Sequence, residues 1–331
     1  MSVVAAMSIG RPWSPATMSA QRLSNRTRDL LAAMAVFVLC LSQQIQAKAD
    51  EVLQNAQNGH KFAESELGEQ YYEKKDYTRA REWFLKAAEQ GEAMAQGMLG
   101  AMSYLSEGGP KDLIQARKWY LASANGLLMP EAKRAVSAAL CGMYYRGEGG
   151  PKDLAGAAKW CLAAAQLGDV NSQAVVGKMY QDGEGVTKDY TEARRWYLDA
   201  AKQGHVLAEG MLGGMYIYGE GGPKDYSEAR RWFLKAAEQH EPNAEVMLGA
   251  MYYYGWGGPR NYAEARKWFL KSARQGNADA RMMLRQGNGV VVTSRPGYNQ
   301  APTFSAPSWF TCHSVLSGAP MIAGMAGCSP W

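Results

Sequence analysis

The sequence predicts an all-α protein, built as a solenoid of helix-turn-helix repeats, from two observations. Tryptophan recurs at separations of 36, 41, 36, 36 and 36 residues, and an alanine stands three residues before each one. The tryptophans are Trp83, Trp119, Trp160, Trp196, Trp232 and Trp268. Glycine-rich segments such as GEGGPKDY (219–226) separate them. A fixed period near 36 residues is typical of an array whose units stack on their neighbours.

Each repeat contains two segments with helical spacing. In one repeat the first segment places Leu212, Met215 and Tyr216 at i, i+3 and i+4, which makes one apolar face. The second segment, 229–236, carries a facing stripe of alanine and aromatic residues. Asp225 precedes the second segment, where it can cap free backbone N–H groups, and the GEGGP segment ends the first. We therefore expect an antiparallel helix pair in every repeat, with the tryptophans in the core rather than in a row that stacks on carbohydrate.

The charge distribution divides the chain into three parts. Residues 1–49 hold five basic residues and one acid, and 288–331 hold a single charge, Arg295. Subtracting these from the 36 basic and 31 acidic residues leaves 30 of each in 50–287, so the body is neutral. The net charge of +5 therefore lies in the two ends of the chain. Because the body has no basic excess, we do not expect nucleic acid as a partner. The tail 288–331 has no helical period and is rich in Gly, Pro and Ser, which favours disorder or a mispredicted gene end.

The N-terminal part has the features of an export signal. Two arginines precede a twelve-residue apolar run, 30–41, which is short for a membrane-spanning helix. Ala47-Lys48-Ala49 supplies the small-x-small pattern of a cleavage site. We predict cleavage near Ala49, a periplasmic or secreted protein, and no stable membrane span after processing. An uncleaved anchor and a start at Met18 stay open as alternatives.

The body, 50–287, contains a half-repeat cap and six repeats. The cap is 52–68, a helix expected to begin just after the cleavage site. The first full unit lacks the glycine-rich insertion, and the extra residues around 127–131 lengthen one turn between repeats. A seventh first helix begins near Asn277 and fails at Gly287.

These motifs resemble the Sel-one-like repeat (SLR) family, which is related to tetratricopeptide repeats. The segment 203–239, QGHVLAEGMLGGMYIYGEGGPKDYSEARRWFLKAAEQ, carries the pattern most completely, and the resemblance covers 50–287. It implies a right-handed α/α solenoid that scaffolds or binds other proteins. Exported bacterial relatives imply roles in envelope assembly, regulation or host interaction.

The candidate binding face comes from residues that point away from the core stripe of the first helices. We expect a concave groove there for a protein or peptide partner. Its candidate residues are Tyr72, Tyr104, Tyr145, Gln181, Ile217, Tyr218, Tyr253 and Tyr254. Tyrosine suits recognition because it offers apolar area and a hydroxyl. Packing of these tyrosines on neighbouring helices is the alternative.

Arginine and lysine pairs beside the tryptophans, such as Arg194-Arg195 and Arg230-Arg231, form a basic ridge. The ridge could bind an acidic polysaccharide or another envelope polymer, but glutamates three residues earlier favour self-pairing on a solvated helix face. The sequence indicates no metal ligand set, no cofactor and no activated nucleophile, so we expect a protein that is not an enzyme.

Cys141 and Cys161 form one candidate disulfide. Cys141 replaces the glycine of its first helix, and Cys161 follows Trp160 on the second, about one turn out of direct opposition. Cysteine-rich relatives of the family in Helicobacter, linked to β-lactams, suggest weak β-lactam binding or hydrolysis as an alternative function. Cys312 and Cys328 in the tail form a second candidate pair.

Overall fold

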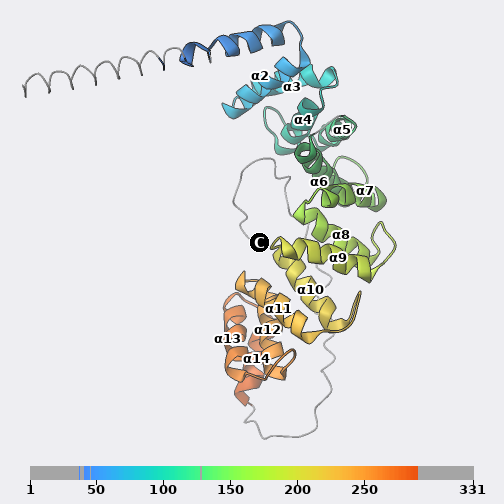
Figure 1. Ribbon diagram of the computed structural model, residues 1–331, viewed down its shortest axis with the longest axis vertical. Helices are drawn as coiled ribbons and strands as arrows, with labels where there is room; N and C mark the ends of the chain where they lie inside the picture. Colours follow the sequence, from blue (N-terminus) through green and yellow to red (C-terminus); the bar gives the residue numbers. More distant parts are fainter. Residues whose placement is uncertain (1–36, 38–40, 45, 127–128, 290–331) are drawn as a thin grey trace, which may run out of the picture.

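The computed structural model describes residues 37, 41–44, 46–126 and 129–289. Its helices form consecutive pairs that stack into an elongated, curved array (Figure 1). The first helices are α2 (Lys61–Glu73), α4 (Ala93–Leu105), α6 (Pro130–Arg146), α8 (Val170–Asp182), α10 (Val206–Tyr218), α12 (Pro242–Tyr254) and α14 (Ala278–Gly289). The second helices are α3 (Tyr77–Glu89), α5 (Leu113–Ala124), α7 (Leu154–Gln166), α9 (Tyr190–Lys202), α11 (Tyr226–Glu238) and α13 (Tyr262–Arg274). No strand occurs among the described residues, and the predicted all-α solenoid is confirmed.

The helix boundaries follow from capping residues. The Asp225 carboxylate accepts hydrogen bonds from the N–H groups of Ser227 and Glu228 at 2.9 and 3.0 Å, which caps α11. The equivalent caps of the other second helices are Asp76, Asp112, Asp153, Asp189 and Asn261. At the other boundary, Gly219 ends α10 at φ 74°, a left-handed conformation that favours glycine.

Each helix pair packs most closely where a glycine meets an aromatic ring. A Cβ added to Gly213 would lie 2.8 Å from the Phe233 ring, so only glycine fits. The same pairs are Gly68 with Phe84, Gly100 with Tyr120, Gly177 with Tyr197, and Gly249 with Phe269. The residue after each repeat tryptophan is therefore buried in the core of its helix pair. Trp196 and Trp232 are buried as expected, but Trp83, Trp119, Trp160 and Trp268 are only partly buried.

The third repeat replaces this contact by a covalent bond. Cys141 stands at the glycine position and Cys161 at the aromatic position, and the two form a disulfide with Cα atoms 4.7 Å apart. The expected offset of one turn is wrong, because these two positions face each other in every other pair. The pair Cys312 and Cys328 lies outside the described residues.

Three element boundaries differ from the expected ones. The extra residues near 127–131 do not only lengthen a turn, because α6 has 17 residues where α4 has 13, with Pro130 in its first turn. The N-terminal helix does not begin at Val52, since residues 46–57 are all helical. Helix α14 extends to Gly289, past the expected break at Gly287. No helix in the described part of the chain is both long and apolar enough to cross a membrane.

Candidate functional site: the first-helix face

Tyrosines of the first helices reach across to the next repeat. The Tyr72 hydroxyl donates a hydrogen bond to the Glu107 carboxylate at 2.8 Å, and the Tyr145 hydroxyl donates to Glu184. Each glutamate lies in the glycine-rich loop of the following repeat. These contacts, with the one made by Tyr104, form a series that we call the tyrosine ladder. The ladder joins neighbouring repeats through groups that the sequence assigned to partner binding.

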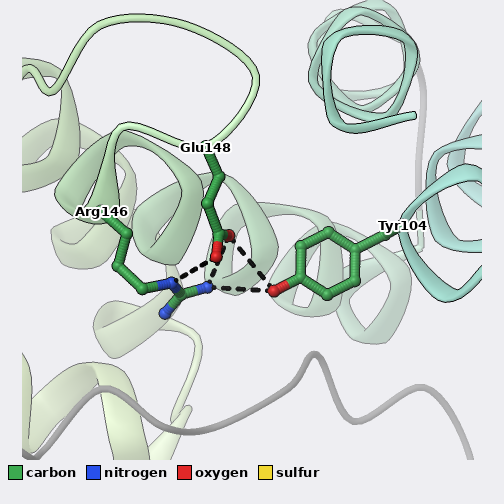
Figure 2. A network of polar contacts seen from close by, with 3 residues as sticks. All are labelled: Tyr104, Arg146 and Glu148. Carbon is green, nitrogen blue, oxygen red and sulfur yellow. Dashed lines mark hydrogen bonds and ion pairs between the residues drawn. The ribbon is translucent and has the colours of Figure 1, made fainter. Parts of the chain in front are cut away.

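The middle rung of the ladder contains a third residue. Tyr104 donates to the Glu148 carboxylate at 3.2 Å, and Arg146 forms an ion pair with the same carboxylate at 2.9 Å (Figure 2). The Arg146 guanidinium also donates to the Tyr104 hydroxyl oxygen at 3.3 Å. The three side chains point toward one another and close a small polar network.

The network shifts the pKa values of its members in opposite directions. Burial raises the pKa of Glu148, but hydrogen bonds and charge from Arg146 outweigh it, so the net pKa is lowered. Burial raises the pKa of Tyr104, and Glu148 raises it further while Arg146 opposes the rise. Both shifts favour an ionised glutamate and a protonated tyrosine, the states that the hydrogen bonds need.

The ladder changes character in the fourth and fifth repeats. Gln181 is buried, accepts a hydrogen bond from the Tyr197 hydroxyl at 2.9 Å, and also contacts Glu220 in the next loop. Ile217 is buried in an apolar cluster against which Trp256 packs. Gln181 and Ile217 therefore do not line an open surface, contrary to the expectation from sequence.

An aromatic cluster stands where the ladder ends. We define it as Tyr226, Tyr253, Tyr254, Trp256 and Tyr262. The Tyr254 and Trp256 rings stack with centroids 5.1 Å apart, and Tyr226 stacks on Trp256 at 6.0 Å. Tyr253 meets Tyr254 edge-on at 5.0 Å and Tyr262 at 5.2 Å. The cluster joins α11, α12, α13 and the loop between the last two.

Part of this aromatic surface is open to solvent. Tyr262 is 44% exposed, and Tyr218, one repeat earlier at the end of α10, is 37% exposed. Tyr253, Tyr254 and Trp256 are partly buried. Burial and nearby Tyr253 raise the pKa of Tyr254, so its hydroxyl is neutral at physiological pH.

The sequence reasoning missed the loop residues that determine whether a repeat contributes to the tyrosine ladder or to the aromatic cluster. Each is the eighth residue after Leu99, Leu140, Val176, Leu212 or Leu248, and they are Glu107, Glu148, Glu184, Glu220 and Trp256. Their common spacing was visible in the sequence, as was the single replacement of glutamate by tryptophan. Their contacts with the preceding repeat were not visible, because these depend on how neighbouring repeats stack.

The basic ridge is largely occupied by internal contacts. Its outward arginines pair with glutamates at i,i+3, as Arg195 does with Glu192 at 2.7 Å and Arg231 with Glu228 at 2.8 Å. Its inward arginines stack on tyrosine rings of the next repeat, as Arg194 does on Tyr216, with 3.7 Å between guanidinium carbon and ring centroid. The expected self-pairing is present.

A second series of polar contacts joins the opposite ends of the helix pairs. Gln239 donates to the buried Glu209 at 2.9 Å, and Gln275 donates to the buried Glu245 at 2.8 Å. Burial raises the pKa of Glu209. These contacts couple the exposed end of a second helix, at Gln239 or Gln275, to a buried glutamate on the first helix of the same pair.

Among the described residues, no group of His, Cys, Asp and Glu could hold a metal ion. His205 has a structural contact, because its Nδ1 accepts a hydrogen bond from the Ala208 N–H at 3.2 Å and caps α10. Burial lowers the pKa of His205.

Comparison with known families matches this arrangement of repeats. The Sel1 repeat model matches residues 63–92, 93–126, 135–169, 170–205, 206–240 and 242–277, which is more than half of the chain. The chain belongs to the Sel1 repeat family. Sel1 repeat arrays are generally protein-interaction scaffolds, so the family indicates protein partners.

Two solved structures of Sel1 repeat proteins resemble this Sel1 array. One is c5321, a protective antigen of uropathogenic Escherichia coli with an SLR fold. It is 36% identical over 73% of this chain and 53% of its own, with a TM-score of 0.61, so this chain spans about half its length. The other is a Sel1 repeat protein from Oxalobacter formigenes, 28% identical over 66% of this chain and 88% of its own, with a TM-score of 0.57. Comparison with curated proteins found no match.

Proposed function

We propose that this Sel1 repeat protein is an exported, non-enzymatic scaffold that binds a peptide or protein segment in the concave groove of its first helices. The observation that carries the proposal is the partly exposed aromatic cluster, with the exposed Tyr218 one repeat earlier. Envelope assembly, regulation and host interaction are the settings in which such a scaffold would act.

The proposal shifts the contact region toward the C-terminal repeats. Tyr72, Tyr104 and Tyr145 use their hydroxyls in the ladder, so these hydroxyls are already bonded within the array. The aromatic cluster instead presents several rings side by side. Such surfaces supply apolar area at low cost in side-chain entropy, and aromatic residues are enriched at the centres of protein interfaces.

A pair of full-chain variants tests the binding face. Tyr254→Ala removes a ring from the cluster, whereas Tyr72→Phe alters the ladder and leaves the cluster intact. We expect affinity capture from the native cell envelope to lose its specific partner with Tyr254→Ala and keep it with Tyr72→Phe. Equal capture by two folded variants would contradict the assignment.

Export is supported by where the fold begins. In the helix 46–57 the buried residues are Val52 and Ala56, which pack near Leu67, so cleavage after Ala49 would remove no side chain that is buried among the described residues. The disulfide between Cys141 and Cys161 suits an oxidising compartment. Fractionation with N-terminal sequencing should find a mature chain that begins at Asp50 outside the cytoplasm. Full-length protein in the cytoplasm would contradict export.

No specific observation favours the two alternative functions, polysaccharide binding and chemistry on β-lactams. Polysaccharide binding needs free cations along the basic ridge, but the arginines described above are paired or stacked. Chemistry on β-lactams by this cysteine pair needs a free thiol, but Cys141 and Cys161 are bonded to each other in the core.

A further inference from the structure

We propose that a proline-containing segment of this same chain, residues 295–303, docks on the aromatic cluster. The segment reads RPGYNQAPT and follows α14 by a few residues. The proposal concerns the face used in the proposed function, but it needs no external partner. If residues 295–303 bind the aromatic cluster, an external partner must compete with them for the same surface.

The first argument is the shape of the surface. The Tyr254 and Trp256 rings are inclined by 25° to each other, and Tyr226 and Trp256 by 24°, so Trp256 stacks with a tyrosine from each of two neighbouring helix pairs. Tyr253 stands edge-on to this stack, at 79° to Tyr254. Grooves lined by aromatic rings are a recurrent way to bind proline in the extended polyproline II conformation.

The second argument is the position of α14. A short turn, 275–277, joins it to α13, so we infer that it runs antiparallel to α13 and parallel to α12, with the C-terminal ends of α12 and α14 on the same side of the array. Leu284, in its C-terminal half, packs against the same apolar cluster as Tyr253 and Tyr254. The chain therefore leaves the array beside the aromatic cluster.

The third argument is reach. Packed helices are about 8–10 Å apart. The residues from 290 to 295, at about 3.1 Å each when extended, span roughly 19 Å. This length is enough to carry Arg295 and Pro296 from the end of α14 to the rings on α12 and α13.

The fourth argument is the spacing of the prolines. Pro296 and Pro302 are six residues apart in the sequence. A polyproline II helix has three residues per turn, so two turns place these prolines on the same side of the segment. That side can face the stacked rings, and Arg295 adds the only charge of the tail.

Photo-cross-linking in the purified full chain tests the proposal. The photoreactive aromatic residue p-benzoylphenylalanine replaces Tyr254 and keeps a ring in the cluster. In a mixture of isotopically light and heavy chains, we expect cross-links from position 254 to 290–307 within single chains. The variant P296A/P302A should lower their yield about tenfold, the change expected when anchoring contacts are lost. Cross-links to α14, which is within reach of the probe, show that the probe is active.

Control positions separate the other outcomes. The same probe at Tyr104, which lies in the ladder, should give no cross-link to 290–307. Trp256→Glu, which restores the glutamate of the other repeats, should reduce the tail cross-link at position 254. Cross-links between light and heavy chains would assign the surface to a second copy and overturn the proposal. An active probe without tail cross-links would overturn it as well. The cross-linking experiment contains no partner. Its result therefore does not determine the result of the partner-capture experiment that tests the proposed function.

Discussion

Cys141 faces Cys161 across α6 and α7 at the place where the other described pairs from α2 to α13 pack glycine against an aromatic ring. In the third repeat a disulfide bond therefore replaces the packing of an aromatic ring against a glycine. The bond joins residues 20 apart in the sequence, and such a cross-link limits the conformations of the unfolded chain.

Reduction of this disulfide should destabilise the array. For cysteines at this sequence separation, closing the loop with a disulfide raises the free energy of unfolding by roughly 3 kcal/mol. Urea denaturation with and without reductant measures the difference. The double variant C141G/C161Y, which restores the contact of the other repeats, should recover much of the loss and become insensitive to reductant. Sensitivity of this variant equal to that of the native chain would contradict the assignment.

Two glycines of α10 should respond oppositely to alanine. At Gly213 a new Cβ would lie 2.8 Å from the Phe233 ring, so Gly213→Ala should cost about 1–3 kcal/mol of stability by overpacking. At Gly210 no atom lies within 4 Å of the added Cβ, so Gly210→Ala should gain roughly 0.5–1 kcal/mol from helix propensity. Thermal denaturation of both variants checks the prediction, and equal effects would refute the close approach.

His205 should make the stability depend on pH. Burial lowers its pKa in the folded protein, while the charge of Asp169 acts in the opposite direction. A base with a depressed pKa contributes stability above its unfolded value, about 6.5, and loses it as the pH falls through the folded value. Protonation would also remove the acceptor that caps α10.

The variant His205→Asp isolates this effect. Asp169 caps the equivalent position of α8, so aspartate should fold normally at 205. We expect the native chain to lose more stability than the variant between pH 7 and pH 5, as measured by urea midpoints. Parallel profiles would show that His205 does not contribute.

The end of the tyrosine ladder can be rebuilt by two substitutions. Trp256→Glu alone should cost about 1–3 kcal/mol, because it removes ring packing and places a carboxylate beside Ile217. Adding Ile217→Tyr should recover about 1 kcal/mol through a new hydrogen bond like that of Tyr72 with Glu107. A double-mutant cycle in urea measures this coupling. Additive effects would show that the fifth repeat does not share the ladder geometry.

The sequence was sufficient for the fold, because the tryptophan period and the capping aspartates recur within single repeats. The sequence alone did not show which of two adjacent aromatic residues, such as Trp232 and Phe233, packs against the glycine of the first helix, because both are apolar. The binding face was less predictable. The hydroxyl of Tyr145 meets Glu184, 39 residues later, through the stacking of one repeat on the next. Periodicity locates both residues but does not show that they touch.

The switch from Glu220 to Trp256 divides the array into two mechanical regimes. Hydrogen bonds of the tyrosine ladder require fixed directions between neighbouring repeats, whereas hydrophobic contacts are non-directional. Contacts in a solenoid act only between neighbours, so such a difference stays local. We therefore expect the N-terminal repeats to keep one curvature, while the last two can bend to follow the shape of whatever they hold.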